Sequence, residues 1–237
     1  MSDCLEIFRG YPVQRLRVPV GAQDFTLIAP RDPQHLLDDP RVAARFAADE
    51  YMPYWATLWP AALVLADAVA DWPTVPPGRP APRVLELGCG LGLVGLVAAA
   101  RGYDVVISDY DDDALAFACG SAQENGLPVP TARRIDWRRS YADLKPDRIL
   151  AADVLYEARN LEPIARFVAA HLAAGGEALV SDANRAPADG FPAVAAAAGL
   201  RVVVEPRSRP GGARPEHGDA PADRWVTGRI FRLTRAG

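Results

Sequence analysis

The chain has 237 residues, half of them hydrophobic, and a formal net charge of −4. This length allows one large domain or a domain with a small appendage, with a substantial core. The acidic balance gives no support to tight nucleic-acid binding, for which a basic face is expected. No apolar run approaches the ~20 residues needed to cross a membrane, and the acidic N-terminal segment does not resemble a signal peptide. We therefore expect neither a nucleic-acid nor a membrane partner.

Cysteine and histidine are few and scattered along the chain. The three cysteines, Cys4, Cys89 and Cys119, have no spacing typical of a zinc site or a disulfide framework. The three histidines also lie far apart. The sequence therefore predicts no metal site, and the reducing cytoplasm is the expected compartment.

The first fifty residues indicate a small β-rich appendage. Two runs typical of strands, Val13 to Val20 and Phe25 to Ala29, are separated by glycine and proline, which favours a hairpin. A short helix is predicted from Asp39-Pro40 to about Asp49, because proline suits the first turn of a helix. We assign residues 1–50 to this appendage.

A connecting unit follows over residues 51–82. It begins with a segment dense in aromatic residues, Tyr51 to Pro60, and continues as a predicted helix from about Pro60 to Val69. Residues 73–82 are rich in proline and form a linker, so we place a boundary there.

From Arg83 onward, strands and helices alternate, and we assign residues 83–237 to one domain. The predicted strands are 83–87, 104–108, 131–135, 148–152, 177–181, 200–206 and 225–234, and the predicted helices are 92–101, 112–124, 160–173 and 188–198. Such alternation predicts an α/β fold, a Rossmann-like doubly wound sheet of seven strands. Only a polar stretch, 207–223, separates the last two strands, so they are expected to pair antiparallel across a mobile loop.

One stretch, Val84 to Gly95, has the pattern of a buried strand that breaks into a glycine-rich turn and then begins a helix. Glycine allows a ligand to approach the backbone closely, next to a helix N-terminus that favours nucleotide-like ligands. Gly90 to Gly95 match the dinucleotide pattern G-x-G-x-x-G, with Asp109 near the expected spacing, which would indicate NAD. Glu86 argues against NAD, because a carboxylate beside a pyrophosphate is unfavourable, whereas a cationic sulfonium or amine would be favoured.

The same stretch, Glu86-Leu87-Gly88-Cys89-Gly90-Leu91-Gly92, resembles the first motif of class I S-adenosylmethionine (SAM) methyltransferases. The resemblance covers roughly residues 50–205. Together with three further motifs, this stretch resembles the seven-β-strand protein-lysine methyltransferase family, family 16. These motifs are Ser108-Asp109-Tyr110-Asp111, Asp136-Trp137 and Ala151 to Glu157. Pro53-Tyr54-Trp55-Ala56 and Leu58-Trp59-Pro60 are most similar to bacterial relatives of the electron-transfer-flavoprotein β-subunit lysine methyltransferase.

This resemblance implies SAM as the cofactor and a set of residues that contact it. Asp109 is expected to accept hydrogen bonds from both ribose hydroxyls, since a carboxylate has two acceptor oxygens. Asp136 is expected to accept from the adenine amine, Trp137 to pack on the adenine ring, and Trp59 to cover the cofactor. The full predicted set is Trp59, Glu86, Gly88, Cys89, Gly90, Gly92, Asp109, Tyr110, Asp136, Trp137 and Ala152.

The acceptor is expected at the end of the fourth strand, because open α/β sheets bind ligands at the carboxyl ends of their strands. Asp153 is the predicted catalytic residue that orients the acceptor amine and attracts its ammonium form. Tyr156 is predicted to form an aromatic wall and to hydrogen-bond the amine. Tyr54 and Trp55 are predicted to shape the slot for the substrate chain.

Several of these side chains also have an ordinary structural interpretation. Glu86 could act as a helix-start carboxylate, the three residues after Tyr110 as helix N-terminal charges, and Trp55 and Trp59 as core residues. Asp153 could cap a loop.

The sequence therefore predicts a SAM-dependent methyltransferase that N-methylates a lysine side chain of a protein. N-methylation of a small molecule stays open, as do an NAD-dependent oxidoreductase and a non-catalytic SAM-binding module. Methylation of nucleic-acid bases is disfavoured, because Asp153-Val154-Leu155-Tyr156 lacks the two prolines usual in base amino-methyltransferases.

Overall fold

The computed structural model describes residues 6–38, 52–212, 214–215 and 225–236, together with positions 42, 44, 46 and 47. The predicted helix from Asp39 to Asp49 lies for the most part outside these residues, and so does Tyr51. Within the described residues, no helix is long and apolar enough to cross a membrane.

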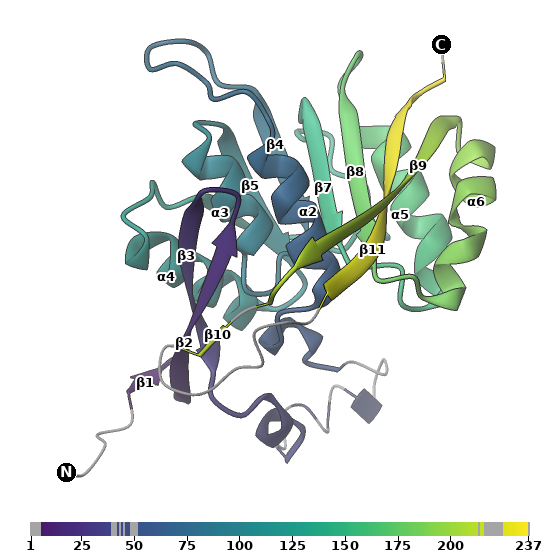
Figure 1. Cartoon of the computed structure of the whole chain (residues 1–237). Helices are drawn as coiled ribbons and strands as arrows, with labels where there is room; N and C mark the ends of the chain where they lie inside the picture. Colours follow the sequence, from purple (N-terminus) through teal and green to yellow (C-terminus); the bar gives the residue numbers. More distant parts are fainter. Residues whose placement is uncertain are drawn as a thin grey trace.

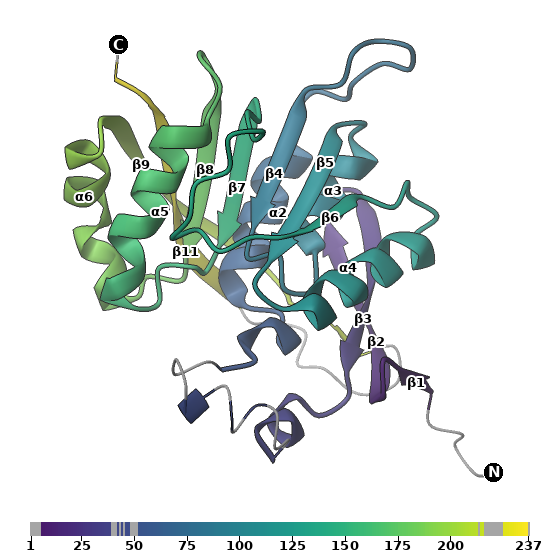
Figure 2. The same cartoon turned by 180° about the vertical axis from the view of Figure 1, so that it is seen from behind.

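Seven strands form the main sheet, in the order β6-β5-β4-β7-β8-β11-β9 (Figure 1; β6 is labelled in Figure 2). The strands are β4 (Arg83–Leu87), β5 (Asp104–Asp109), β6 (Thr131–Arg134), β7 (Arg148–Ala152), β8 (Glu177–Asp182), β9 (Leu200–Pro210) and β11 (Trp225–Arg235). The first five in this order pair in parallel, whereas β11 lies antiparallel to both β8 and β9. This arrangement confirms the predicted sheet, which is mostly parallel and has an antiparallel last strand.

Helices cover both faces of the sheet. One face carries α2 (Pro60–Ala70), α3 (Leu93–Ala100) and α4 (Asp112–Glu124), and the other carries α5 (Ala158–His171) and α6 (Phe191–Ala197), which Figure 2 shows. Val84 of β4 packs with the first set, whereas Leu85 and Leu87 pack with the second. Because successive side chains of a strand point to opposite faces, a strand covered on both sides has a continuous apolar sequence.

The predicted elements differ most from the structure between residues 186 and 215. The helix predicted over 188–198 is divided into a 3-10 turn, η3 (Ala186–Gly190), and α6. Pro192 occupies the second position of α6, where the N–H group that proline lacks would have no partner within the helix. Strand β9 continues to Pro210, so the predicted loop 207–223 begins as a strand, and Arg214–Pro215 of the same loop form the short strand β10.

The predicted N-terminal hairpin is present as β2 (Tyr11–Val20) and β3 (Gln23–Pro30), which pair antiparallel. Strands β1 (Ile7–Phe8) and β10 pair with the other edge of β2. The C-terminal loop therefore returns to the N-terminal hairpin.

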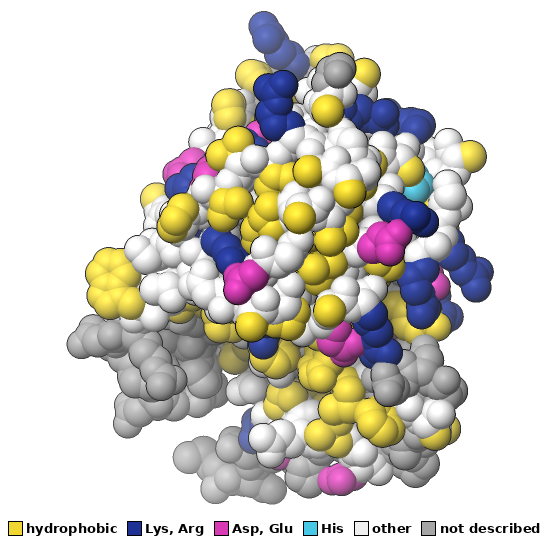
Figure 3. Space-filling view, turned by 90° about the vertical axis from the view of Figure 1, so that its right-hand side faces the viewer, with side chains coloured by type: hydrophobic (Ala, Val, Ile, Leu, Met, Phe, Trp, Pro, Cys, Tyr) yellow, Lys and Arg dark blue, Asp and Glu magenta, His cyan; other side chains and the backbone are white. Residues whose placement is uncertain are grey.

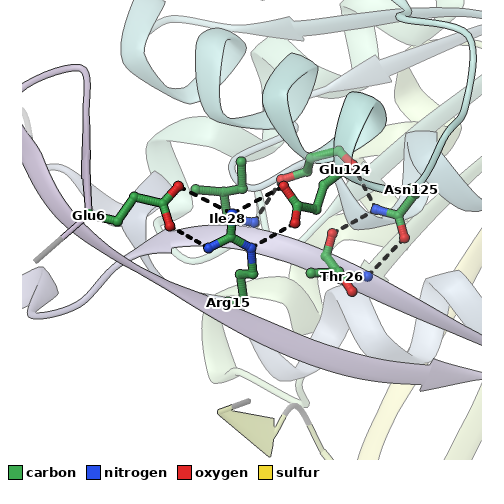
Figure 4. Close-up of polar contacts among 7 residues, drawn as sticks. Glu6, Arg15, Thr26, Ile28, Glu124 and Asn125 are labelled. Carbon is green, nitrogen blue, oxygen red and sulfur yellow. Dashed lines mark hydrogen bonds and ion pairs between the residues drawn. The ribbon is translucent and has the colours of Figure 1, made fainter. Parts of the chain in front are cut away.

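Polar contacts attach the hairpin to the C-terminal end of α4 (Figure 4). The Asn125 side chain accepts a hydrogen bond of 2.9 Å from the Thr26 backbone nitrogen and donates one of 2.6 Å to the Thr26 carbonyl oxygen. Arg15 forms ion pairs with both Glu6 and Glu124. Hydrophobic residues of the hairpin belong to the same cluster as α2, α3 and α4, while the division of the chain at residues 50 and 82 stays a prediction.

Strand β9 forms one edge of the main sheet, beside α6. Figure 3 shows hydrophobic side chains gathered on this side of the molecule. Val203 and Val204 of β9 are exposed. The same strand carries Glu205 and Pro206. Charge and proline on an edge strand oppose pairing with a further strand.

Candidate active site

A cavity of about 560 Å³ lies at the carboxyl ends of β4, β5, β7 and β8, beneath the aromatic segment before α2. The residues predicted from the sequence that line it are Tyr54, Trp55, Trp59, Glu86, Gly88, Cys89, Gly90, Asp109, Tyr110, Asp136, Trp137, Ala152, Asp153 and Tyr156. We call the part around the turn after β4 the glycine-turn end, and the part around Asp153 and Tyr156 the Asp153 end.

Gly92 is the one predicted site residue outside this lining. It adopts a φ of +83° just before α3, and a Cβ atom there would lie 2.5 Å from the Cβ atom of Ala118 in α4. The absence of a side chain at Gly92 therefore serves the packing of α4. Gly90, in contrast, lines the cavity, and a Cβ atom there would lie 3.3 Å from the Trp55 carbonyl oxygen.

Glu86 is buried within the sheet and holds the start of α3. Its Oε2 atom accepts a hydrogen bond of 2.9 Å from the Gly95 backbone nitrogen, and its side chain is 2% exposed. Burial raises the pKa of Glu86 to about 8, against the hydrogen bond from Gly95, which lowers it. The carboxyl group is therefore mostly protonated at neutral pH. This corrects the argument that its negative charge excludes a pyrophosphate and selects a cationic group.

Asp109 connects β5 to the glycine turn. Its two oxygens each accept a backbone hydrogen bond of 3.0 Å, from Gly90 and from Asp111. Burial raises its pKa to about 6. Because each carboxylate oxygen has two lone pairs, the side chain keeps acceptor capacity toward the cavity. Asp111 accepts from the Asp113 nitrogen and caps α4, in agreement with its expected helix-terminal role.

Asp136 forms an ion pair with Arg138. Its two oxygens accept hydrogen bonds of 2.8 Å and 2.9 Å from the Arg138 guanidinium, and this arginine lowers the pKa of Asp136. The predicted contact with an adenine amine must therefore share this carboxylate with Arg138. The Trp137 ring lies against the turn after β4, 3.4 Å from the position that a Cβ atom on Gly88 would take.

The aromatic segment supplies the wall of the Asp153 end. Tyr54 makes edge-to-face contacts with Tyr156 and with Trp59, at ring-centroid distances of 5.2 Å and 5.9 Å. Burial raises the pKa of the Tyr156 hydroxyl, so this group is a hydrogen-bonding phenol at neutral pH. Trp55 is 7% exposed and its ring packs on Phe117 of α4, so it contributes to the core more than to a slot for substrate.

Asp153 follows β7 in the left-handed conformation, with a φ of +57°. Its carboxylate accepts two hydrogen bonds from the Arg185 guanidinium, of 2.8 Å from Nε and 2.9 Å from Nη2. Arg185 comes from the segment after β8 and also lines the cavity. Arg185 is not among the residues predicted from the sequence. Asp153 was predicted because ligands bind at the carboxyl ends of parallel strands, and the same rule applies to Arg185, which follows β8.

Several further lining residues that were not predicted come from the start of α5 and from the loop after β6. They are Glu157, Arg159, Asn160 and Pro163 at the Asp153 end, and Arg138 at the glycine-turn end. Within the described residues, no group of three or more His, Cys, Asp or Glu side chains could hold a metal ion.

The glycine-turn end fits a nucleotide-like group. The cavity has the size of pockets that bind such ligands, about 300–1,000 Å³. Gly88 and Gly90 lack the Cβ atoms that would narrow it, Asp109 offers carboxylate oxygens, and Trp137 offers an aromatic face. The contacts of these residues with a cofactor stay predictions.

Residues 49–190, more than half of the chain, match a family described as lysine methyltransferase. The chain belongs to this family. SAM, the predicted cofactor, is the methyl donor of the family, and the site described above fits it.

Individual relatives differ in the residue that their names specify. The histone-arginine methyltransferase METTL23 of Homo sapiens is 34% identical over 113 residues, which are 45% of this chain and 58% of that protein. The protein N-lysine methyltransferase METTL21A of Danio rerio is 37% identical over 43% of this chain and 48% of that protein. The electron transfer flavoprotein beta subunit lysine methyltransferase of Danio rerio is 33% identical over 44% and 40%, respectively. The chain thus spans about half the length of the relatives it matches.

Among solved structures, the precorrin-6y C5,15-methyltransferase of Geobacter metallireducens has a TM-score of 0.55 at 13% sequence identity. The similarity covers 73% of this chain and 87% of that chain. At this identity, the likeness supports the fold alone.

Proposed function

We propose that this protein transfers a methyl group from SAM to the amine of a lysine side chain in a protein substrate. The observation that carries the proposal is the shared cavity, in which Asp153 and Tyr156 lie beside the glycine turn. Strands β4 and β7 are adjacent in the sheet, so the two ends of the cavity are neighbours. Membership in the lysine methyltransferase family supports the choice of substrate.

Each end of the cavity has its own task in this proposal. Asp109 and Trp137 hold the nucleoside part of the cofactor, and the backbone at Gly88 and Gly90 allows its close approach. Bound SAM supplies an electrophilic methyl group on a sulfonium centre. Because methyl transfer is an in-line displacement, the protein contributes mainly by positioning a neutral amine. Asp153 and Tyr156 orient that amine, and the rings of Tyr54 and Tyr156 flank the aliphatic part of the side chain.

Binding measurements test the cofactor first. We expect titration calorimetry to show binding of SAM and S-adenosylhomocysteine and none of NAD. Binding of NAD without binding of SAM would overturn the proposal in favour of an oxidoreductase.

Labelling then tests the substrate class. The purified protein is incubated with methyl-labelled SAM and a desalted cell lysate, and labelled material is treated with nuclease and hydrolysed to amino acids. We expect methyl-lysine in protein. Label confined to methyl-arginine or to small molecules would contradict the proposal, and the names of the relatives make the arginine outcome a real alternative.

Two variants make the labelling experiment specific. Asp153→Ala removes the side-chain oxygens that orient the acceptor amine, so it should abolish transfer while SAM affinity stays close to that of wild type. Lys145 is the one lysine in the sequence, donates a hydrogen bond to the Ala170 carbonyl oxygen, and is not among the residues that line the cavity. Lys145→Arg therefore excludes self-methylation of a lysine side chain as the source of label.

The cytoplasm is the compartment we propose. The proposal rests on the free thiols of Cys89 and Cys119, which a reducing environment preserves.

A further inference from the structure

The Asp153 carboxylate is already occupied by a side chain of this protein. The Arg185 guanidinium binds both of its oxygens, and the side chains of Asp153 and Arg185 are 3% and 34% exposed. Bidentate pairs of this kind restrict the orientation of both groups as well as stabilising them. Asp153 is therefore not a free carboxylate that waits for a cation.

The backbone of Asp153 needs such a constraint. A non-glycine residue with a φ of +57° is strained and persists only where the surroundings hold it. The Asp153 nitrogen donates a hydrogen bond of 2.9 Å to the Ser181 carbonyl oxygen of β8, and Arg185 holds the side chain. Both contacts come from β8 and the segment after it.

Arg185 itself is anchored on several sides. Its backbone nitrogen donates to Oδ1 of Asp182 at 2.9 Å, and its carbonyl oxygen accepts from Arg229 at 3.0 Å. Arg229 in turn pairs with Asp182, which is buried. The Arg185 guanidinium also lies 5.3 Å from the centre of the Trp59 ring. This anchoring distinguishes Arg185 from a mobile surface arginine that contacts Asp153 by chance.

The charges at this end of the cavity cancel. Among the residues that the structure describes, four charged side chains line it, and they form two ion pairs, Asp153 with Arg185 and Glu157 with Arg159. A lone carboxylate beside an incoming ammonium group would favour its protonated form, whereas a neutralised one does not. The cancellation therefore favours the neutral amine, which is the form that can accept a methyl group.

We propose that Arg185 is a positioning residue of the transfer reaction, which fixes the orientation of Asp153 and cancels its charge so that the acceptor amine is bound in its neutral form. This inference rests on the proposed function. It assigns Arg185 to the acceptor side of the reaction and gives it no part in cofactor binding.

The main test compares three variants, with lysate protein as the acceptor and SAM at saturation. We expect Arg185→Ala to lower the initial rate by about 10- to 100-fold, since small misplacements of reacting groups have effects of this size. SAM affinity should stay near that of wild type. Arg185→Lys should recover part of the rate, because it restores the charge without the planar fork. The matched control is Arg166→Ala, which removes an exposed arginine of α5 that pairs with Glu162 outside the cavity.

Chemical rescue separates positioning from a purely structural role. Guanidinium chloride at low millimolar concentration should restore part of the rate of Arg185→Ala, and sodium chloride at the same concentration should not. If guanidinium does not restore the rate of Arg185→Ala and Arg185→Lys is as slow as Arg185→Ala, then Arg185 only maintains the fold. A higher rate in Arg185→Ala would show instead that the arginine blocks the acceptor.

The pH dependence of the rate tests whether Arg185 cancels the charge of Asp153. The other titratable or charged groups that face this pair are Tyr54, Tyr156, Glu157, Arg159, Asp182 and Arg229. With these unchanged, Arg185→Ala should need a more alkaline pH for its half-maximal rate, because the unpaired Asp153 favours the ammonium form. A profile identical to that of wild type would overturn the charge argument. An inactive wild-type protein would contradict the proposed function instead, so the two failures are distinguishable.

Discussion

The Asp109 carboxylate accepts a hydrogen bond of 3.0 Å from the backbone nitrogen of Gly90. This contact joins the end of β5 to the turn after β4, and the same carboxylate also accepts from the Asp111 nitrogen before α4. One side chain therefore shapes the glycine turn and offers its remaining lone pairs to the cavity.

Substitution of Asp109 should weaken cofactor binding. Asp109→Asn removes the charge and one of the two acceptor oxygens, so we expect SAM affinity to fall by about 1–3 kcal/mol, the scale of hydrogen bonds to a charged group. Titration calorimetry measures the change. Asp104→Asn is a suitable control, because Asp104 is an exposed aspartate at the opposite end of the same strand. Equal affinities of the two variants would contradict the assignment of the ribose to Asp109.

The buried Glu86 should make the folded state less stable as pH rises. Below its ordinary pKa of 4.5, the carboxyl group is protonated in both the folded and the unfolded chain. Between pH 4.5 and about 8, the unfolded chain releases the proton while the folded chain retains it. The unfolded state is therefore favoured progressively, by at most about 1.4 kcal/mol per pH unit from this group.

Glu86→Gln isolates this effect, because glutamine still offers an oxygen to the Gly95 nitrogen but does not ionise. We expect the free energy of unfolding of the variant, relative to wild type, to increase between about pH 5 and about pH 8. Urea denaturation at the two pH values measures it. A difference between the proteins that does not change with pH would show that Glu86 does not titrate in this interval.

Gly92 should tolerate alanine poorly for reasons of packing. Its Cβ atom would lie 2.5 Å from Ala118, whereas Gly199 has the same φ of +83° and nothing within 4 Å of its Cβ position. Backbone strain is thus similar in Gly92→Ala and Gly199→Ala, but only Gly92→Ala brings the new Cβ atom into contact with Ala118. Overpacking a core costs about 1–3 kcal/mol, so Gly92→Ala should be less stable than Gly199→Ala by this amount in thermal or urea unfolding. Equal stabilities would show that α4 moves aside without cost.

The attachment of the hairpin should depend on Asn125. Asn125→Ala leaves the Thr26 backbone groups without this partner, so we expect a loss of about 1–3 kcal/mol in the free energy of unfolding. Arg17→Ala is the control, because it removes only an exposed ion pair with Asp24, which should change stability by less than about 1 kcal/mol. If both variants unfold alike, the hairpin is held by its apolar contacts alone.

Local sequence patterns were sufficient to place the strands and helices from Arg83 to Asp182, whereas the division of η3 from α6, the length of β9 and the short strand β10 were not predicted. Strands covered on both faces are continuously apolar, and the helices between them have recognisable ends, so these local signals survive without knowledge of the fold. The resemblance likewise found residues that line one cavity, since the carboxyl ends of neighbouring parallel strands necessarily meet there.

Charge states and partners were decided by the tertiary structure. The sequence predicts a charged carboxylate at Glu86. Nothing in Glu86-Leu87-Gly88 reveals that this carboxyl group is buried and accepts a hydrogen bond from Gly95, nine residues later. Arg185 lies 32 residues from Asp153 in the sequence and came into contact with it only because β7 and β8 are adjacent in the sheet. A sequence pattern shows which side chains a segment carries. The ionisation of these side chains depends on the surrounding dielectric, and their pairing depends on contacts between distant segments. Both exist only once the sheet is assembled.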